Sequence, residues 1–160
     1  MIVLITDNMI TECIDLMRVS VSQNDYEPYG KNERCWIEHL TTHVKEQSLG
    51  NPKFLAIADV GDAMDGSKYI KGFMLASAFV NYYTQEYVMD VKDCIVDSDY
   101  RNAFTVKRLF DAMIDHTKKH GGKYWRADSI RDPEKAKEYS EFLQRKYNAI
   151  PFHGVHGKIE

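Results

Sequence analysis

The stretch 91–122 constrains the fold most strongly, because it joins a strand to a helix through a short polar turn. Apolar β-formers come first, then a turn rich in aspartate, and then positions that recur at steps of three and four on one helix face: Val106, Leu109, Phe110, Met113 and Thr117. Gly121 and Gly122 end this predicted helix. A strand, a turn and a helix N-terminus in this order direct backbone N–H groups toward an anion.

Length and composition are typical of a soluble globular protein. A chain of 160 residues fits one domain over 1–160 and is long enough to bury a core. Hydrophobic residues make up 44% and charged residues 28% of the chain, which argues against long disorder. The net charge of −3 favours neither nucleic acid nor an anionic membrane as a partner. We expect a cytoplasmic protein without those partners, and a homodimer stays open.

The cysteines support an intracellular location. Cys13, Cys35 and Cys94 form an odd number without paired spacing, and each has apolar neighbours. We therefore expect three buried, reduced thiols.

The remaining sequence predicts strands and helices in a defined order. Runs of β-formers predict strands over 1–6, 54–60, 69–83, 86–96 and 123–130, with one or two short strands over 151–159. Amphipathic repeats behind capping residues predict helices over 9–22, 33–47 and 133–147, in addition to the helix after the turn. We expect an α+β fold with a mixed, mostly antiparallel sheet of about six or seven strands, flanked by about four helices.

This order of elements and one motif resemble the GCN5-related N-acetyltransferase superfamily over the whole chain. The motif DCIVDSDYR at 93–101 is similar to that family's fourth strand and following turn, in which Val, Pro, Glu, Tyr and Arg are usual. Val96, Tyr100 and Arg101 match directly, and Ser98 stands where Pro is common. The pair at 72–73, Gly-Phe, resembles the opening of the family's third strand. The resemblance implies a single-domain fold of this superfamily.

The resemblance also implies acetyl-CoA as co-substrate. In the family, a splayed fourth strand faces the pantetheine arm and the acetyl group, and the next turn and helix N-terminus hold the pyrophosphate. On this chain it assigns the acetyl group to Cys94, Ile95 and Val96. It assigns the phosphates to Arg101, Asn102, Ala103, Phe104, Thr105 and Val106.

The turn departs from the family pattern at its small residues. The pattern has Gln or Arg, two residues, Gly, one residue, and Gly or Ala, whereas this chain has Phe104 and Val106 at the two small positions. No glycine stands between Gly72 and Gly121. Two functions therefore remain open. One is an N-acetyltransferase whose primary amine acceptor, a small molecule or a protein, attacks acetyl-CoA directly. The other is a non-catalytic protein of the same fold that serves as a binding or assembly module, for instance in a viral or phage particle.

The resemblance implies Asp93 as the general base, because related enzymes often carry an acidic residue at this place on the fourth strand. The alternative for Asp93 is a solvated carboxylate or a partner for Lys92, and Glu86 is a second candidate base.

The general acid of the family is commonly a tyrosine on the last helix. The family's spacing can be counted from two positions. Counted forward from Asp132, which stands where an Asn is frequent in the family, it gives Tyr139. Counted back from Asn148, which stands where a Gly is usual, it gives Gln144. We take Tyr139 as the candidate acid, and core packing is its alternative role.

The predicted acceptor contacts are tyrosines. Tyr26 and Tyr29 lie between the first two predicted helices, where the family usually builds its acceptor site, and Tyr83 lies in a predicted hairpin. For Tyr83, ordinary strand propensity is the alternative explanation.

Two histidine pairs have the helical spacing of metal ligands, namely His39 with His43 and His116 with His120. Neither pair has an evident third ligand, so we expect no metal.

Overall fold

The structure is a computed structural model that describes residues 1–22, 32–101, 103–128 and 133–151. Tyr26, Tyr29 and Asn102 lie outside the described residues, as does nearly all of the predicted strand region 151–159. The chain divides into two compact units, of which the first comprises Met1–Ser20 and Asn32–Asp128. The second unit contains the helix α4 (Pro133–Tyr147). One domain over 1–160 therefore stays a prediction.

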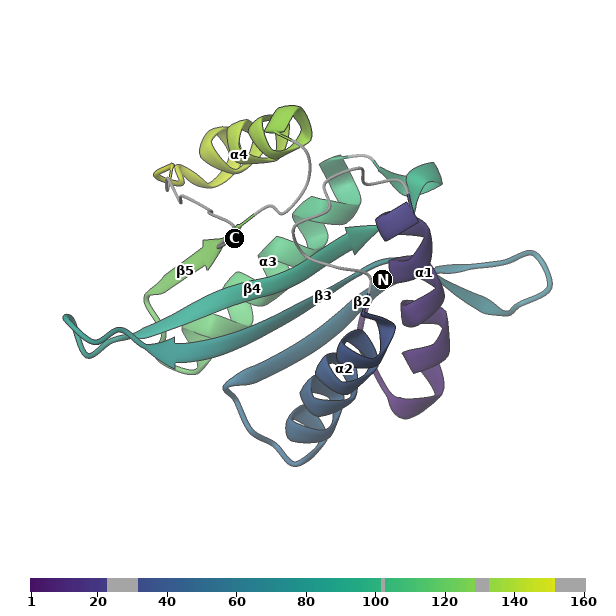
Figure 1. Cartoon of the computed structure of the whole chain (residues 1–160), viewed down its shortest axis with the longest axis horizontal. Helices are drawn as coiled ribbons and strands as arrows, with labels where there is room; N and C mark the ends of the chain where they lie inside the picture. The colour runs from purple at the N-terminus through teal and green to yellow at the C-terminus, as the bar shows by residue number, and fades with distance from the viewer. Residues whose placement is uncertain (23–31, 102, 129–132, 152–160) are drawn as a thin grey trace, which may run out of the picture. The chain divides into compact units, whose positions relative to one another are not determined.

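A five-stranded sheet in the order β1-β2-β3-β4-β5 forms the centre of the first unit (Figure 1). The strands β1, β2, β3 and β4 are antiparallel to their neighbours, whereas β5 runs parallel to β4. Their bounds are Ile2–Leu4, Phe54–Asp62, Lys68–Val80, Tyr87–Val96 and Tyr124–Ala127. The mixed, mostly antiparallel sheet is thus confirmed. Six or seven strands is too high for the described residues, because the additional strands were expected in the region 151–159.

Helices cover both faces of this sheet. In Figure 1, α1 (Ile10–Ser22) and α2 (Glu33–Ser48) lie over one face, and α3 (Ala103–Lys119) lies over the other. The side chain of Asn32 caps α2, since its Oδ1 accepts a hydrogen bond of 3.3 Å from the Cys35 N–H. Gly121 follows α3 with a φ of 78°, the left-handed conformation that glycine adopts without strain. The four predicted helices are therefore present, and none of the described ones is long and apolar enough to span a membrane.

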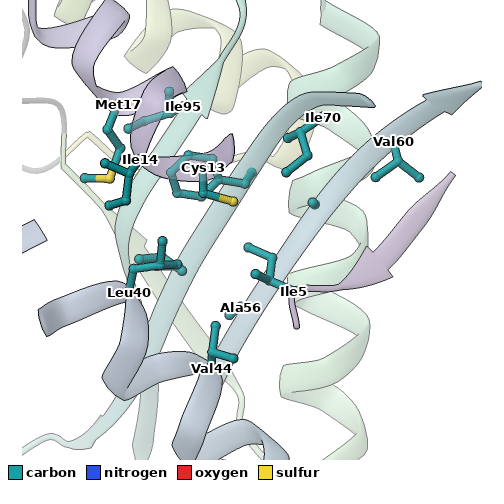
Figure 2. Close-up of a cluster of buried hydrophobic side chains, with 13 residues drawn as sticks. Ile5, Cys13, Ile14, Met17, Leu40, Val44, Ala56, Val60, Ile70 and Ile95 are labelled. Carbon is teal, nitrogen blue, oxygen red and sulfur yellow. The ribbon is translucent and has the colours of Figure 1, made fainter. Parts of the chain in front are cut away.

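The main core lies between α1, α2 and one face of the sheet (Figure 2). The helices contribute Leu40 and Val44 from α2 and three residues from α1, and the strands contribute every second side chain. Burial is nearly complete at Leu40, Phe73 and Leu75. This packing fixes α2 against the strands that carry the site described below.

On the other face, an ion pair between a buried carboxylate and an exposed arginine connects α3 to the sheet. Asp59 of β2 is fully buried and accepts a hydrogen bond of 2.9 Å from Nε of Arg108, and the Met1 amino group lies 3.0 Å from the same carboxylate. Burial acts to raise the pKa of Asp59, but these donors outweigh it and hold the pKa below its ordinary value. The start of α3 is therefore anchored to β2.

The cysteine expectation is correct only in part. Cys13 is buried, and burial together with the charge of Glu12 raises its pKa to about 12. Cys94 is half-buried. Cys35 is exposed, contrary to the prediction, because it lies in the first turn of α2 and precedes the part of the helix that packs on the sheet.

Gly72 is expected to be intolerant of a side chain. A Cβ added there would lie 2.8 Å from the carbonyl oxygen of Ile95 and 3.1 Å from Cα of Val96. Because backbone atoms block the space, Gly72→Ala should lower the free energy of unfolding by about 1–3 kcal/mol in urea denaturation. Ser77→Ala on the same strand is the control, with an expected change within about 0.5 kcal/mol. Equal stabilities for the two variants would contradict this close approach.

Candidate active site

The candidate site lies where β4 continues past its pairing with β5. The parallel pairing runs from Val88↔Tyr124 to Val91↔Ala127, and β4 extends on to Val96. Figure 1 shows β5 as a short strand beside the first part of β4. The main chain of residues 92–96 thus lies beyond the described end of β5. The residues that the sequence assigns to the acetyl group, Cys94, Ile95 and Val96, belong to this extension.

A β-bulge at Lys92 changes the face of the sheet to which the side chains of this extension point. Leu75 pairs with Asp93 and Ala76 with Val91, so Lys92 is an extra residue in β4. Without the bulge, residues 90 and 93 would point to opposite faces of the sheet. With it, Asp90 and Asp93 lie on the same face, the one that α2 covers.

Asp93 contacts one histidine of α2, His39, and the charge of a second, His43, also acts on it. His39 Nε2 lies 3.5 Å from Oδ2 of Asp93, and the two side chains are 38% and 22% exposed. One turn further, His43 Nδ1 lies 2.9 Å from the carbonyl oxygen of His39, and the two rings are 4.3 Å apart. His43 is only 2% exposed, and its Nε2 has no hydrogen-bond partner among the described residues. We call His39, His43 and Asp93 the His–Asp cluster.

In the His–Asp cluster, the pKa of the carboxyl group is raised and the pKa values of the two imidazoles are lowered. Burial raises the pKa of Asp93, although the nearby charges of His43 and Lys92 oppose the shift. Burial, with the charge of Lys92, lowers the pKa of His39. Burial likewise lowers the pKa of His43. A carboxylate that is more basic than usual therefore lies beside a neutral imidazole at neutral pH, an arrangement suited to proton transfer.

Asp90, on the same face, is in the opposite electrostatic situation. It pairs in register with Arg126 of β5, whose Nε and Nη2 donate hydrogen bonds of 2.8 and 2.9 Å to the two carboxylate oxygens. Lys92 also contacts this carboxylate. The guanidinium carbon of Arg126 lies 4.7 Å from the ring centre of Phe79. Burial acts to raise the pKa of Asp90, but the hydrogen bonds from Arg126 and Lys92 outweigh it and lower the pKa. Asp90 thus holds β5 on β4 one residue before the end of their described pairing.

The turn after β4 leads into α3 without glycine. A short 3₁₀ helix, Ser98–Tyr100, is capped by Asp97, whose Oδ1 accepts a hydrogen bond of 2.9 Å from the Asp99 N–H. Nε of Arg101 donates to the carbonyl oxygen of Val96 at 3.4 Å. None of the described residues of this turn has a positive φ. Glycine is therefore not required for their backbone conformation.

The first turn of α3 is compatible with an anion. Its described residues include no acidic side chain, which would repel an anion at the positive end of the helix dipole. The Phe104 side chain is 69% exposed, whereas Thr105 is buried. The bulky residue that replaces a family glycine therefore extends into solvent, and does not fill the interior at the start of the helix.

Other predicted residues lie away from the His–Asp cluster. Tyr83 is 90% exposed in the turn between β3 and β4, at the end of β4 opposite to Val96. The structure does not bring it together with Asp93. Glu86, the second candidate base, pairs with Lys123 at 2.8 Å.

Tyr139, the candidate acid, and Gln144, the position that the second count gives, are on α4 in the second unit. Tyr139 is half-buried, and Gln144 donates a hydrogen bond of 3.1 Å to Ser140. The role of Tyr139 stays a prediction.

His39 is the residue that the sequence analysis missed as a partner of Asp93, because the histidine pairs were considered only as metal ligands. The sequence pattern could have indicated this contact, because His39 lies on the helix beside Leu40 and one turn before His43, and both of those residues are buried. Within the described ranges, no three His, Cys, Asp or Glu side chains are arranged so that they could hold a metal ion, and this includes the His–Asp cluster.

Comparisons with known proteins support the fold. Neither the models of protein families nor the curated proteins give a match. Among solved structures, the ribosomal-protein-alanine N-acetyltransferase from Brucella melitensis biovar Abortus 2308 matches with a TM-score of 0.66 and 19% identity, over 100% of this chain and 99% of that chain. An aminoglycoside acetyltransferase from an uncultured soil metagenomic sample, in complex with sisomicin, matches with a TM-score of 0.68 and 15% identity, over 100% and 95%.

A third solved structure, AAC(6')-Iy in complex with the bisubstrate analogue CoA-S-monomethyl-acetylneamine, matches with a TM-score of 0.68 and 13% identity, over 100% of this chain and 97% of that chain. The resemblance drawn from the sequence is thus confirmed for the fold, which is that of the GCN5-related N-acetyltransferases.

Arg126→Met should lower the free energy of unfolding at neutral pH by about 2 kcal/mol, because it removes charged hydrogen bonds from a buried carboxylate. The pKa of Asp90 is lowered in the folded state, so this stabilisation is present above the unfolded-state pKa and is lost as the pH falls through the folded-state pKa. Urea denaturation at several pH values should show the deficit shrinking in acid.

Lys123→Met provides the control, because Lys123 pairs with Glu86 at a more exposed position, where each residue directly precedes one of the same two strands. It should change the free energy of unfolding far less than Arg126→Met does, because water screens an exposed ion pair. A deficit for Arg126→Met that does not depend on pH would argue against the ion pair as its source.

Proposed function

We propose that this protein, which has the GCN5-related N-acetyltransferase fold, transfers an acetyl group from acetyl-CoA to a primary amine that attacks directly. The observation that carries the proposal is a carboxylate of raised pKa, Asp93, on the strand extension beyond β5. The structural neighbours named above support it, since they include acetyltransferases and a complex with a CoA-linked bisubstrate analogue.

The residues at the site fit acetyl-CoA in two respects. Residues 92–96 continue past β5, so their main chain is placed to hydrogen-bond an extended ligand as a further strand would. The first turn of α3, Ala103–Val106, supplies backbone N–H groups and positive dipole for phosphates, and Arg101 adds a cation. When bound, acetyl-CoA would supply an acetyl group activated as a thioester.

Asp93 then acts as the general base. The amine loses a proton as its nitrogen bonds to the acetyl carbon, and an acceptor at this place removes that proton. The raised pKa makes Asp93 a better proton acceptor at neutral pH than an exposed aspartate. Asp90 cannot replace it, because Arg126 and Lys92 stabilise its ionised form. Tyr139 is the proposed acid that returns a proton to the departing thiolate.

For the acceptor, we propose a primary amine on a small molecule or a protein. One neighbour was solved with sisomicin, which supports a small-molecule acceptor. Tyr26, Tyr29 and Tyr83 remain the proposed contacts. The protein is proposed to act in the cytoplasm, with neither nucleic acid nor membrane as a partner.

Acetyl-CoA should bind the purified protein with a dissociation constant in the range of roughly 1 μM to 1 mM, measured by isothermal titration calorimetry. Arg101→Glu should weaken binding about tenfold or more, because it places negative charge before the start of α3. The matched control is Arg34→Glu on an exposed part of α2, which should leave the affinity unchanged. No binding at millimolar acetyl-CoA would reject the enzyme and leave the binding-module alternative.

Asp93→Asn should lower kcat about 100-fold or more without loss of stability. The folded-state pKa of Asp93 is raised, so its ionised form costs stability as the pH rises through that pKa, and the neutral amide avoids this cost. Steady-state acetylation of an amine panel and urea denaturation at pH 7 measure the two effects. Asp62→Asn, at the exposed end of β2, is the control. An unchanged kcat would remove Asp93 as the base.

A further inference from the structure

We infer that His39 is a proton-relay residue, which receives through Asp93 the proton that the amine loses and delivers it to solvent. The inference rests on the proposed function and adds to it a residue outside the strand that the family resemblance identifies. His39 acts through Asp93 and is therefore a positioning and relay residue.

The geometry makes His39 the exit from a buried base. Its Nε2 is 3.5 Å from Oδ2 of Asp93, close enough to tighten into a hydrogen bond or to be bridged by a water. Asp93 is mostly buried, whereas the His39 side chain is 38% exposed. A proton taken up at Asp93 therefore reaches water through an imidazole that contacts both.

The buried ring of His43 provides a second nitrogen that can accept a hydrogen bond within the cluster. Its Nδ1 lies 2.9 Å from the carbonyl oxygen of His39, and since a carbonyl only accepts, this nitrogen carries the hydrogen. Its Nε2 is then an acceptor, buried and without a partner among the described residues. Such a group is costly unless a neighbour donates to it, and Asp93 is near enough for its charge to act on the pKa of His43.

The surrounding charges favour release of the proton. From β4, Lys92 faces the cluster beside Asp93, and its charge lowers the pKa of both histidines. From α2, His43 is the neighbour of His39. Together with burial, Lys92 keeps His39 neutral before it accepts a proton, and makes the protonated ring give it up readily.

The step is balanced without a further reactant. The amine N–H bond breaks as the nitrogen bonds to the acetyl carbon, and the proton passes to the Asp93 carboxylate. The thioester C–S bond would break in exchange, and the departing thiolate would take a proton from the proposed acid, Tyr139, which regains one from water. It then passes to His39 Nε2, and Nδ1 of the same ring releases a proton to water. Nothing is oxidised or reduced.

A kinetic experiment on the whole chain tests the relay. His39→Gln should lower kcat at least tenfold with the KM for acetyl-CoA unchanged, and imidazole in the buffer should restore part of the rate in His39→Ala. His120→Gln is the matched control, because His120 also stacks on a histidine four residues before it, but it lies directly after the end of α3, away from the cluster. The double variant with Asp93→Asn should be no slower than Asp93→Asn alone.

An NMR titration tests the pair without measuring acetylation. In Asp93→Asn, the pKa of His39 should fall, because the carboxylate that stabilises its charged form is gone, while the pKa of His116 should stay the same. An active enzyme whose kcat is unchanged in His39→Gln overturns the relay alone, as does an unaltered His39 titration. A wild-type protein that binds no acetyl-CoA overturns the proposed function together with the relay.

Discussion

The extra residue at Lys92 is the constraint on which the candidate site depends. It reverses the alternation of β4 so that Asp90 and Asp93 share the face covered by α2. Two neighbouring features hold the strand in place. The Asp90–Arg126 pair holds β5 beside β4 up to Val91↔Ala127, and the missing side chain of Gly72 lets the end of β4 approach β3 closely. The strand extension at residues 92–96 is the result.

The same bulge produces two carboxylates with opposite properties. Asp90 is buried with two cations in contact, so its charged form is stabilised and its role is structural. Burial destabilises the charged form of Asp93, although the charges of His43 and Lys92 oppose this effect, so Asp93 takes up protons more readily. Environments that shift the pKa values of two carboxyl groups in opposite directions suit the two groups to different roles. The contrast supports Asp93 over Asp90 as the chemical group.

The glycine-free turn shows how the fold accommodates an unusual sequence. A turn that requires left-handed backbone needs glycine, but the described residues here form a 3₁₀ turn capped by Asp97 with negative φ throughout. Phe104 is exposed, so its bulk is not placed in the interior. The departure from the family pattern is therefore compatible with a helix N-terminus that faces an anion.

The sequence alone determined the order and type of the described elements, the cap at Asn32 and the resemblance to the fold, because these follow from local periodicity and capping chemistry. Tertiary structure alone decided the register of β4, since a bulge depends on pairing with β3. It also decided that His39 meets Asp93, because a contact between residues so far apart in the chain depends on how α2 packs on the sheet. The sequence selected Asp93, but only the packing around it set its pKa.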